Sequence, residues 1–290
     1  MPVRGMEPSG NAATVAQKRG VPTEIAFFSE ATARALKARG VVADVVYGAN
    51  VLAHVPDMRD FVAGFPHVLK PGGTLILEFP HLLKMLEYVE FDTIYHEHFS
   101  YLSLMAVERA LAASGLSVYD LDCLPSHGGS SRLYCAFTAS GRVESAMVRK
   151  VREVEREAAL VNPDTFARVV IRIGSLCDTF SDFLHIVRSD GKKLAAHGAA
   201  AKGNTFLNTC GMTEADILCA FDRNPHKQGK LLPGSHIPVL SPDEISILRP
   251  DYVVILPWNL REEIQKQLVG IAEWGGRFVV AVPDLAIFAP

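Results

Sequence analysis

The stretch KKLAAHGAAAKGNTFLN, residues 192–208, decides the fold because it holds the parts of one α/β unit in order. A short apolar strand runs into a loop of glycine and alanine, and a helical segment follows that loop. Strand-like and helix-like segments continue to alternate through residues 215–225, 250–268 and 275–285. Alternation of this kind predicts a parallel sheet with helices on both faces. We therefore predict an α/β unit in the C-terminal part of the chain.

The N-terminal part of the chain shows the same alternation. Glycines end two of its helix-like segments, and runs of β-branched residues form its strand-like segments, which is the usual punctuation of α/β proteins. The predicted helices are 12–20, 29–40 and 57–69, and the predicted strands are 21–28, a buried strand at 43–50 and, after a KPGG turn, 74–80. This part of the chain is also predicted to form a parallel sheet.

Two long segments with helical periodicity lie between these parts, at 144–161 and 162–191. We interpret them as a helical connector between two α/β units. The predicted domain boundary falls earlier, so that residues 1–122 form the first domain and residues 123–290, connector included, form the second.

Composition excludes several classes of protein. The 290 residues carry a net charge of −3, which gives no indication of a nucleic-acid or membrane-surface partner. No apolar run approaches the roughly 20 residues of a membrane-spanning helix. The five cysteines form no CxxC pair and no zinc-ligand spacing. Free thiols in a reducing cytoplasm are the simplest interpretation.

The densest chemistry lies in FDTIYHEHFSYLS, where Tyr95, His96, Glu97 and His98 are consecutive ionisable side chains. On an extended segment His96 and His98 would share one face. Imidazole titrates near neutrality and a neighbouring carboxylate can orient it, so acid–base catalysis is one interpretation. The H-x-H spacing also suits a metal, but without a third ligand we predict no metal site. A half-exposed polar loop is an equally good interpretation.

Two loops in the N-terminal part carry further candidates. GMEPSGN places Glu7 before a helix, and an acid at the end of a strand commonly binds the ribose hydroxyls of a nucleotide cofactor. GANVLAHVPD follows the predicted buried strand and carries His54 at the end of the sheet where open α/β folds bind ligands. A helix-entry turn for Glu7 and a helix cap for His54 are the structural alternatives.

The loop SHGGSSR combines a pair of glycines with His127 and Arg132. Backbone and guanidinium could approach an anionic substrate there. A hairpin turn between strands 116–123 and 131–138 explains the same residues at least equally well.

The loop GAAAKGN, which follows a strand and opens a helix, suits a phosphate because backbone N–H groups and Lys202 point outward. It lacks the GK[ST] ending of a Walker A motif. The neighbouring stretch DRNPHKQG carries Arg223 and two more basic side chains, so a basic rim for a nucleoside diphosphate is plausible. A solvated charged loop is the alternative.

These stretches together resemble one enzyme family. EFPHLL, FDTIYHEHFSYLS, LPSHGGSSRLY, AAKGNTFLN, FDRNPHKQGKLLPGSHIP and PDYVVILPWNL resemble, in chain order, the S-adenosylmethionine-dependent sugar C-methyltransferases. The resemblance covers nearly all of the chain. It implies methylation of nucleotide-linked keto-deoxysugars, typically at C3 of a 4-keto sugar. It also implies a zinc-binding module, a Rossmann-like methyltransferase domain and a Rossmann-like C-terminal domain that helps to hold the sugar nucleotide.

The resemblance assigns cofactor residues by position. Glu7 matches the acid that binds the ribose of S-adenosylmethionine, and Phe28 and Ser29 match the segment near the adenine. Asn50 matches the loop near the cofactor that follows the fourth strand.

The resemblance also assigns the chemistry. His54, Tyr95, Glu97 and His98 match the active-site cluster, with His98 as the base, oriented by Glu97. We infer from position that Lys202 and Asn204 face the substrate cleft, and we add the substrate candidates His127, Arg132 and Arg223. The proposed reaction is removal of a C3 proton followed by attack of the enolate carbon on the methyl group, with Tyr95, His54 or His96 as the enolate donor.

The sequence departs from the family at its start. It contains neither the cysteine-rich zinc module nor the first strand with its Gly-rich loop, so the fold begins at the second strand as a partial Rossmann-like methyltransferase domain. We expect a truncated form of a longer protein, or a missing part supplied by another chain. The neighbours of the missing strand should then lack ladder partners and expose apolar side chains.

Other functions stay open. A catalytically inactive truncated homologue that only binds a sugar nucleotide is the main alternative. A metal-dependent hydrolase using His96 and His98 lacks an evident third ligand, and a dehydrogenase lacks a G-x-G-x-x-G motif.

Overall fold

The computed structural model describes residues 2–290, and its internal contacts divide the chain into two compact units. Unit 1 comprises the described residues up to Leu82, together with Phe99–Pro125 and Gly129–Ala158. Unit 2 comprises Leu83–His98, Ser126–Gly128 and Ala159–Pro290. The two units are therefore interleaved along the chain, whereas the predicted boundary between residues 122 and 123 divides it at one point.

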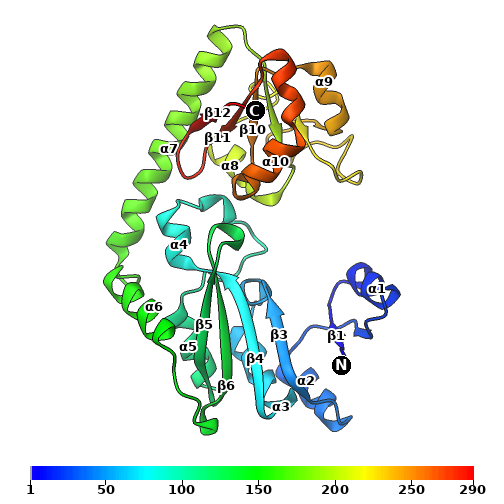
Figure 1. Cartoon of the computed structure of the whole chain (residues 1–290), viewed down its shortest axis with the longest axis vertical. Coiled ribbons are helices and arrows are strands. Elements are labelled where there is room, and N and C mark those ends of the chain that lie inside the picture. The colour runs from blue at the N-terminus through cyan, green and yellow to red at the C-terminus, as the bar shows by residue number, and fades with distance from the viewer. Residues whose placement is uncertain (1) are drawn as a thin grey trace. The chain divides into compact units, whose positions relative to one another are not determined.

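Unit 1 is built on a mixed four-stranded sheet in the order β3-β4-β6-β5 (Figure 1). The predicted strands that became β3 and β4 are parallel, while β4 with β6 and β6 with β5 are antiparallel, so the sheet of this unit is mixed. The hairpin connection between β5 and β6 accounts for the antiparallel pairing of those two strands. The strands are β3 (Ala43–Ala49), β4 (Leu69–Pro80), β5 (Leu116–Leu124) and β6 (Ser130–Phe137), and a separate parallel pair consists of β1 (Gly5–Met6) and β2 (Thr23–Glu24).

The core of unit 1 lies between this sheet and three helices. Alternate residues of β4, namely Leu75, Leu77 and Phe79, are fully buried and belong to the same apolar cluster as the inner faces of α3, α5 and α6. This alternation is the period of two expected of a strand with one face on a core. The helices of the unit are α1 (Gly10–Lys18), α2 (Glu30–Ala38), α3 (Met58–Val68), α5 (Leu104–Ala112) and α6 (Ala146–Glu157), and the 3-10 turn η1 spans Leu52–His54.

Several predictions for unit 1 need correction. β3 pairs with β4 alone among the described strands, and two of its side chains are exposed, Val45 at 47% and Tyr47 at 57%. The prediction of a buried strand is therefore wrong, because β3 lies at a sheet edge. Only two residues of the predicted strand 21–28 pair with a neighbour, and the KPGG segment lies within β4.

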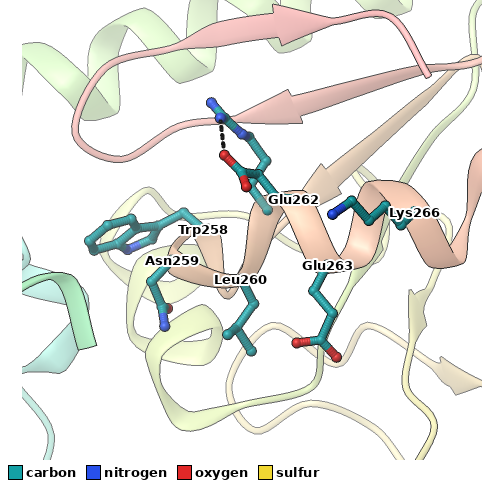
Figure 2. A pocket seen from close by; sticks show the side chains of 7 residues that line it. Trp258, Asn259, Leu260, Glu262, Glu263 and Lys266 are labelled. Atoms are coloured by element: carbon teal, nitrogen blue, oxygen red, sulfur yellow. Dashed lines mark ion pairs between the residues drawn. The ribbon is translucent and has the colours of Figure 1, made fainter. Parts of the chain in front are cut away.

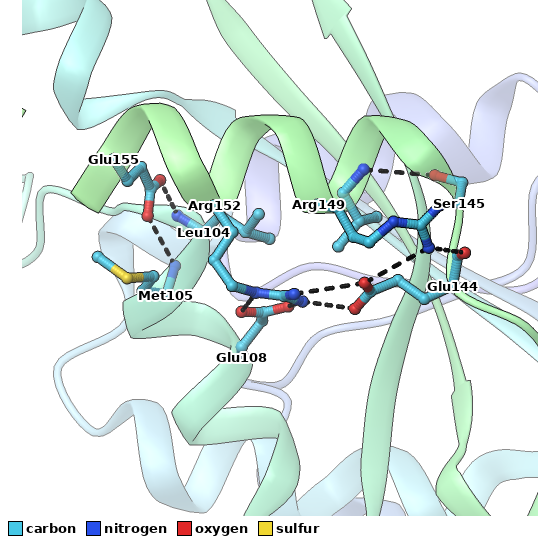
Figure 3. A network of polar contacts seen from close by, with 9 residues as sticks. Leu104, Met105, Glu108, Glu144, Ser145, Arg149, Arg152 and Glu155 are labelled. Atoms are coloured by element: carbon cyan, nitrogen blue, oxygen red, sulfur yellow. Dashed lines mark hydrogen bonds and ion pairs between the residues drawn. The ribbon is translucent and has the colours of Figure 1, made fainter. Parts of the chain in front are cut away.

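A buried polar network attaches α6 to the start of α5 (Figure 3). The carboxylate of Glu155, which is fully buried, accepts hydrogen bonds from the backbone N–H groups of Leu104 and Met105 at 2.5 and 2.9 Å. His81 Nε2 lies 2.6 Å from the same carboxylate. A carboxylate at a helix N-terminus is favoured by the helix dipole, and these contacts offset the cost of its burial.

Unit 2 contains a six-stranded sheet in the order β12-β11-β10-β7-β8-β9 (Figure 1). All its pairings are parallel except that of β11 with β12. The strand order reverses between β7 and β10, and such a switch point is where open α/β sheets bind ligands at the carboxyl ends of the strands. The strands are β7 (Leu194–His197), β8 (Ala220–Phe221), β9 (Val239–Leu240), β10 (Tyr252–Ile255), β11 (Arg277–Val280) and β12 (Ala286–Phe288).

Helices cover both faces of this sheet, as predicted. On one face α7 and α8 pack through residues such as Phe180 and Phe206, and on the other α9 and α10 pack through Ile245 and Ile264. The helices are α4 (Leu82–Glu87), α7 (Pro163–Ser189), α8 (Ala201–Thr209), α9 (Ile245–Leu248) and α10 (Arg261–Gln267), with the 3-10 turns η2 (Phe91–Thr93), η3 (Ser126–Gly128) and η6 (Trp258–Leu260). None of the helices within residues 2–290, the 27-residue α7 included, has the length and apolarity needed to cross a membrane.

Candidate active site

The YHEH motif lies in unit 2, in a turn directly after η2. The predicted extended geometry, with His96 and His98 on one face, is wrong because the backbone of residues 95–97 bends and turns instead of forming a strand. His96 and Glu97 are exposed, whereas Tyr95 and His98 are half-buried. The turn thus separates the two histidines and pairs His98 with the tyrosine.

Tyr95 and His98 form a hydrogen-bonded pair whose rings lie in contact, tilted by 31°. Their ring centroids are 4.2 Å apart, and the phenol oxygen lies 3.2 Å from His98 Nε2. On the other side of the ring, Nδ1 lies 2.9 Å from the carbonyl oxygen of Thr93. A carbonyl can only accept, so in the neutral imidazole Nδ1 carries the proton and Nε2 presents the lone pair toward the tyrosine hydroxyl.

This geometry adds one residue to the predicted set. The Thr93 carbonyl contacts Nδ1 of His98 and Tyr95 contacts Nε2, while the orienting role of Glu97 stays a prediction. Thr93 could not be predicted from the sequence, because every residue has a backbone carbonyl and the residue type does not show which one accepts a hydrogen bond from His98. Thr93 is itself held in place, since its hydroxyl donates to the Glu90 carbonyl at 2.8 Å.

Four side chains from distant segments form a buried cluster beside η2, which we call the Glu90 cluster: Glu90, Asp92, Lys202 and Trp258. Glu90 and Asp92 are 2% and 1% exposed. The indole N–H of Trp258 donates to Asp92 Oδ2 at 2.9 Å, and Lys202 Nζ lies 5.0 Å from the centre of the Trp258 ring. Lys202 Nζ is 3.7 Å from Glu90 Oε2, which is an ion-pair distance without a close hydrogen bond.

Burial dominates the acid–base properties of the Glu90 cluster. It raises the pKa of Glu90 to about 7, against the opposing attraction of Lys202. Burial also raises the pKa of Asp92, while Lys202 and the Trp258 hydrogen bond act in the opposite direction. Near neutral pH the Glu90 carboxyl is therefore divided between its protonated and ionised forms.

The backbone of Gly128 packs closely against Glu90 and Trp258 of the Glu90 cluster. Its backbone has a φ of +87°, and a Cβ at this position would lie 2.0 Å from Glu90 Oε1 and 2.7 Å from Cη2 of Trp258. Only glycine fits such a position. The glycine pair of the SHGG loop thus allows the loop to approach Glu90 closely, which was not foreseen from the sequence, while its neighbour His127 is exposed.

The helix α8 begins at the switch point of unit 2, next to the end of β7. No side chain caps its N-terminus and its first turn contains no acidic residue, although Asp222 Oδ2 accepts from the N–H of Ala199 directly before it at 2.7 Å. Among the described residues, Asn204 Oδ1, His197 Nδ1 and Lys202 Nζ are buried without a hydrogen-bond partner. Arg223 lies exposed after β8. The predicted substrate residues Lys202, Asn204 and Arg223 therefore all belong to unit 2.

The predicted cofactor residues all lie in unit 1. Glu7 is half-buried at the carboxyl end of β1, and its Oε1 accepts from the N–H of Ser9 at 2.8 Å. Asn50 follows β3 with a φ of +53°, and its Oδ1 is buried without a partner among the described residues. An acid at a strand end and a buried amide with an unmade hydrogen bond both fit a polar ligand.

Two of the predicted cofactor residues have structural roles. The ring of Phe28 packs between Phe61 and Phe65, with ring centroids 5.3 and 5.0 Å away. The Ser29 hydroxyl accepts from the N–H of Thr32 and caps α2. The exposed ring in this segment is Phe27, at 74%.

The remaining candidates of unit 1 are His54 and Arg132. His54 is the exposed last residue of η1. Arg132 lies opposite Glu78 across β4 and β6, and its guanidinium donates to Glu78 Oε2 at 2.8 and 3.1 Å. That ion pair raises the pKa of Arg132 and commits its guanidinium to the sheet.

A depression of about 510 Å³ runs along η6 and α10 (Figure 2). Trp258 lies at one end and Lys266 at the other, and Arg261 is paired with Glu262 at 3.5 Å. A single chain segment provides all of its lining residues, and its charges of both signs leave no concentrated field for a diphosphate. Within residues 2–290 no three His, Cys, Asp or Glu side chains are arranged to hold a metal.

Comparison with known proteins places the chain in a family. Residues 125–283 match the C-methyltransferase C-terminal domain, and residues 2–121 match a methyltransferase domain. The chain belongs to the C-methyltransferase family. C-methyltransferase NovU from Streptomyces niveus is 35% identical over 282 residues, which cover 97% of this chain and 67% of NovU.

Two solved methyltransferases illustrate more distant similarity. N-methyltransferase NodS from Bradyrhizobium japonicum is 13% identical over 46% of this chain and 71% of its own, with a TM-score of 0.33. Magnesium protoporphyrin IX methyltransferase from Synechocystis, with bound SAM, is 14% identical over 46% of this chain and 58% of its own, with a TM-score of 0.33.

Family membership confirms the coarser predictions. The Rossmann-like α/β fold and the methyltransferase class are those of this family, and S-adenosylmethionine is the cofactor of its methyltransferase domain. Sequence reasoning missed Glu90, Asp92 and Trp258 as members of the site region. The sequence signal for Glu90 and Asp92 is that two acidic residues stand two positions apart in the mainly apolar stretch YVEFDTI, directly before YHEH.

Proposed function

We propose that the chain catalyses S-adenosylmethionine-dependent C-methylation of a nucleotide-linked keto-deoxysugar through an enolate. The observation that carries this proposal is the Tyr95–His98 pair. His98 has its proton on Nδ1, where the Thr93 carbonyl accepts it, so Nε2 is the basic nitrogen. Tyr95 places a hydroxyl 3.2 Å from that nitrogen. A base and a proton donor held side by side are what abstraction of a proton next to a ketone requires.

The pair suggests how the proton and the charge move. His98 Nε2 takes the proton from the carbon next to the ketone, and the electron pair of the C–H bond moves into the enolate. The Tyr95 hydroxyl donates to Nε2 in the free protein. During the reaction it turns to the developing enolate oxygen, and the lone pair of Nε2 can then accept the substrate proton. General-base catalysis contributes about 10²–10⁴-fold, and the enolate donor supplies several kcal/mol more.

Unit 1 residues fit the methyl donor. When bound, S-adenosylmethionine supplies a methyl group on a positively charged sulfur. The Glu7 carboxylate suits the ribose hydroxyls, and the unpartnered Asn50 Oδ1 suits another polar group of the cofactor. Phe27 replaces Phe28 as our proposal for the adenine contact, because the ring of Phe28 packs against Phe61 and Phe65 while Phe27 is exposed. Ser29 and His54 stay candidates through their positions in these loops.

Unit 2 residues fit the sugar nucleotide. The uncapped N-terminus of α8 and Lys202 favour a diphosphate, and the unpartnered Asn204 Oδ1 favours a hydroxyl donor. Exposed Arg223 and His127 can add positive charge at the rim. Arg132 is the weakest of the predicted substrate residues because Glu78 already binds its guanidinium.

The test is the pair of variants His98→Gln and His96→Gln, assayed with S-adenosylmethionine and a dTDP-linked 4-keto sugar. We expect His98→Gln to lose at least about 10²-fold in methyl transfer, and His96→Gln, whose side chain is exposed, to retain near-normal turnover. Exchange of the substrate proton in D₂O without the cofactor should be lost in parallel. Near-normal turnover of His98→Gln would remove His98 from the role of base.

A second measurement separates catalysis from binding alone. Isothermal titration of the wild-type chain with each ligand should show binding of both, if the chain is an active enzyme. Binding of the sugar nucleotide with neither cofactor binding nor methyl transfer would support an inactive homologue instead. No nucleic-acid partner enters this proposal, and we infer a cytoplasmic location from the free thiols.

A further inference from the structure

The Glu90 cluster joins four motif segments of unit 2. Asp92 precedes YHEH by three residues, Gly128 belongs to SHGG, Lys202 to AAKGN and Trp258 to LPWN. These segments are up to 166 residues apart in the sequence, the separation of Asp92 and Trp258. None of the chemical steps described above uses Asp92 or Trp258, so their buried hydrogen bond needs another explanation.

A short path of hydrogen bonds leads from this bond to His98. Asp92 is the middle residue of η2, and Thr93 is the next. The Thr93 carbonyl accepts from His98 Nδ1 at 2.9 Å and from the N–H of Tyr95 at 3.2 Å. The orientation of this one carbonyl thus sets both the ring nitrogen that carries the proton and the start of the turn that bears the catalytic pair.

The turn η2 is held from outside by packing against α8 and by a side-chain hydrogen bond at Asp92. Its own backbone bonds are local, such as that from the N–H of Ile94 to the carbonyl of Phe91 at 2.9 Å. Phe91 is buried and packs on Phe206, with ring centroids 6.1 Å apart, and this apolar contact fixes the position of the turn without a directional bond. The Trp258 N–H, at 2.9 Å from Asp92 Oδ2, is directional and comes from a different element, so it can fix the rotation of the turn.

We propose that Asp92 and Trp258 are positioning residues that hold η2 so that the Thr93 carbonyl keeps the proton of His98 on Nδ1. Neither residue touches the substrate. The effect on the tautomer stands on the hydrogen bonds alone, while its effect on turnover rests on the proposed base role of His98. The hydrogen bond between Trp258 and Asp92 matters for catalysis because the other tautomer of His98 carries a proton on Nε2. A ring in that form has no lone pair at Nε2 and cannot accept the substrate proton there.

The test uses Trp258→Phe in the full chain, because phenylalanine keeps an aromatic ring beside Lys202 and removes the donor to Asp92. The matched control is Trp274→Phe. Trp274 donates in the same way, at 2.9 Å, to the carbonyl of Pro250, away from η2. The readout is the ring ¹⁵N spectrum of His98, assigned by its disappearance in His98→Gln.

We expect the wild type and Trp274→Phe to show the Nδ1–H form, and Trp258→Phe to show a clear fraction of the Nε2–H form. We further expect kcat to fall about three- to tenfold in Trp258→Phe, the effect of one lost hydrogen bond, with little change in KM for the sugar nucleotide. Asp92→Asn keeps an acceptor for the indole and should retain the wild-type tautomer.

A wild-type His98 spectrum in Trp258→Phe would overturn the proposal. If that variant fails to fold, Asp92→Leu removes the same bond from the other side and decides in the same way, with an unchanged tautomer again contradicting the idea. A shifted tautomer in a chain whose turnover does not depend on His98 would confirm the positioning and refute the proposed base. The two proposals therefore fail separately.

Discussion

The raised pKa of Glu90 predicts that this carboxyl destabilises unit 2 as the pH rises. Its pKa is about 7 in the folded chain, against an ordinary value of 4.5. Between these values the folded state binds more protons than the unfolded state, so the stability contribution of Glu90 is fully present below pH 4.5 and is lost as the pH rises through 7. At about 1.4 kcal/mol for each pH unit in this window, the loss reaches about 3 kcal/mol.

The variant Glu90→Gln removes this titration while keeping the shape of the side chain. We expect the variant and the wild type to have similar stability at pH 4.5, because Glu90 is protonated there in the folded protein. At pH 8 the variant should be more stable by about 3 kcal/mol. Asp92 and Lys202 are common to both proteins, so their titrations largely cancel in the comparison.

The assay is urea unfolding followed by tryptophan fluorescence at pH 4.5, 6 and 8. Both tryptophans of the chain, Trp258 and Trp274, lie in unit 2, so the signal reports on that unit. Glu262→Gln serves as the control, since its side chain is 79% exposed and its loss should change stability by less than about 1 kcal/mol at every pH. Parallel stability profiles for wild type and Glu90→Gln would show that the buried carboxyl does not titrate as we argue.

Two further variants test the packing around the Glu90 cluster and the cofactor side of the protein. Gly128→Ala should cost about 1–3 kcal/mol more than Gly191→Ala, which shares a positive φ but has open space around its Cβ position; equal losses in the urea assay would contradict the close approach to Glu90. Phe27→Ala should weaken S-adenosylmethionine binding by up to about tenfold, whereas Ile25→Ala, 58% exposed in the same segment, should not. Titration calorimetry measures both, and an unchanged Kd for Phe27→Ala would exclude the adenine contact.

Local features of this fold could be predicted from the sequence because they depend on neighbouring residues. The helix beginning after Ser29 is an example, since the serine hydroxyl and Thr32 form a reciprocal cap three residues apart. The strand–loop–helix at 192–208 is another: its alternation places Leu194 and Ala196 on one face of the sheet and Ala195 on the other. In both cases the interactions that decide the structure lie within a few residues.

Features that depend on distant partners could not be predicted. Val45 and Tyr47 read as a buried strand, because their residue types are those of a core, and only the pairing of β3 shows that they lie at an edge. The Asp92–Trp258 bond joins residues that no spacing relates. The tautomer of His98 could not be predicted for a different reason. The Thr93 carbonyl is close to His98 in sequence, but the residue types do not predict the turn that directs this carbonyl toward Nδ1.

Buried polar atoms of unit 2 that lack a hydrogen-bond partner make a final argument for a ligand site. Among the described residues, both carboxylate oxygens of Glu90, Nζ of Lys202, Oδ1 of Asn204 and Nδ1 of His197 are buried without a hydrogen-bond partner. Each costs about 1–3 kcal/mol, and a protein shaped for stability alone would carry apolar side chains there. Three of the four residues lie at the end of β7 or in α8, where the sheet order reverses. Sugar hydroxyls and phosphate oxygens can supply both the missing donors and the missing acceptors, so the same atoms that weaken the free protein would favour the bound one.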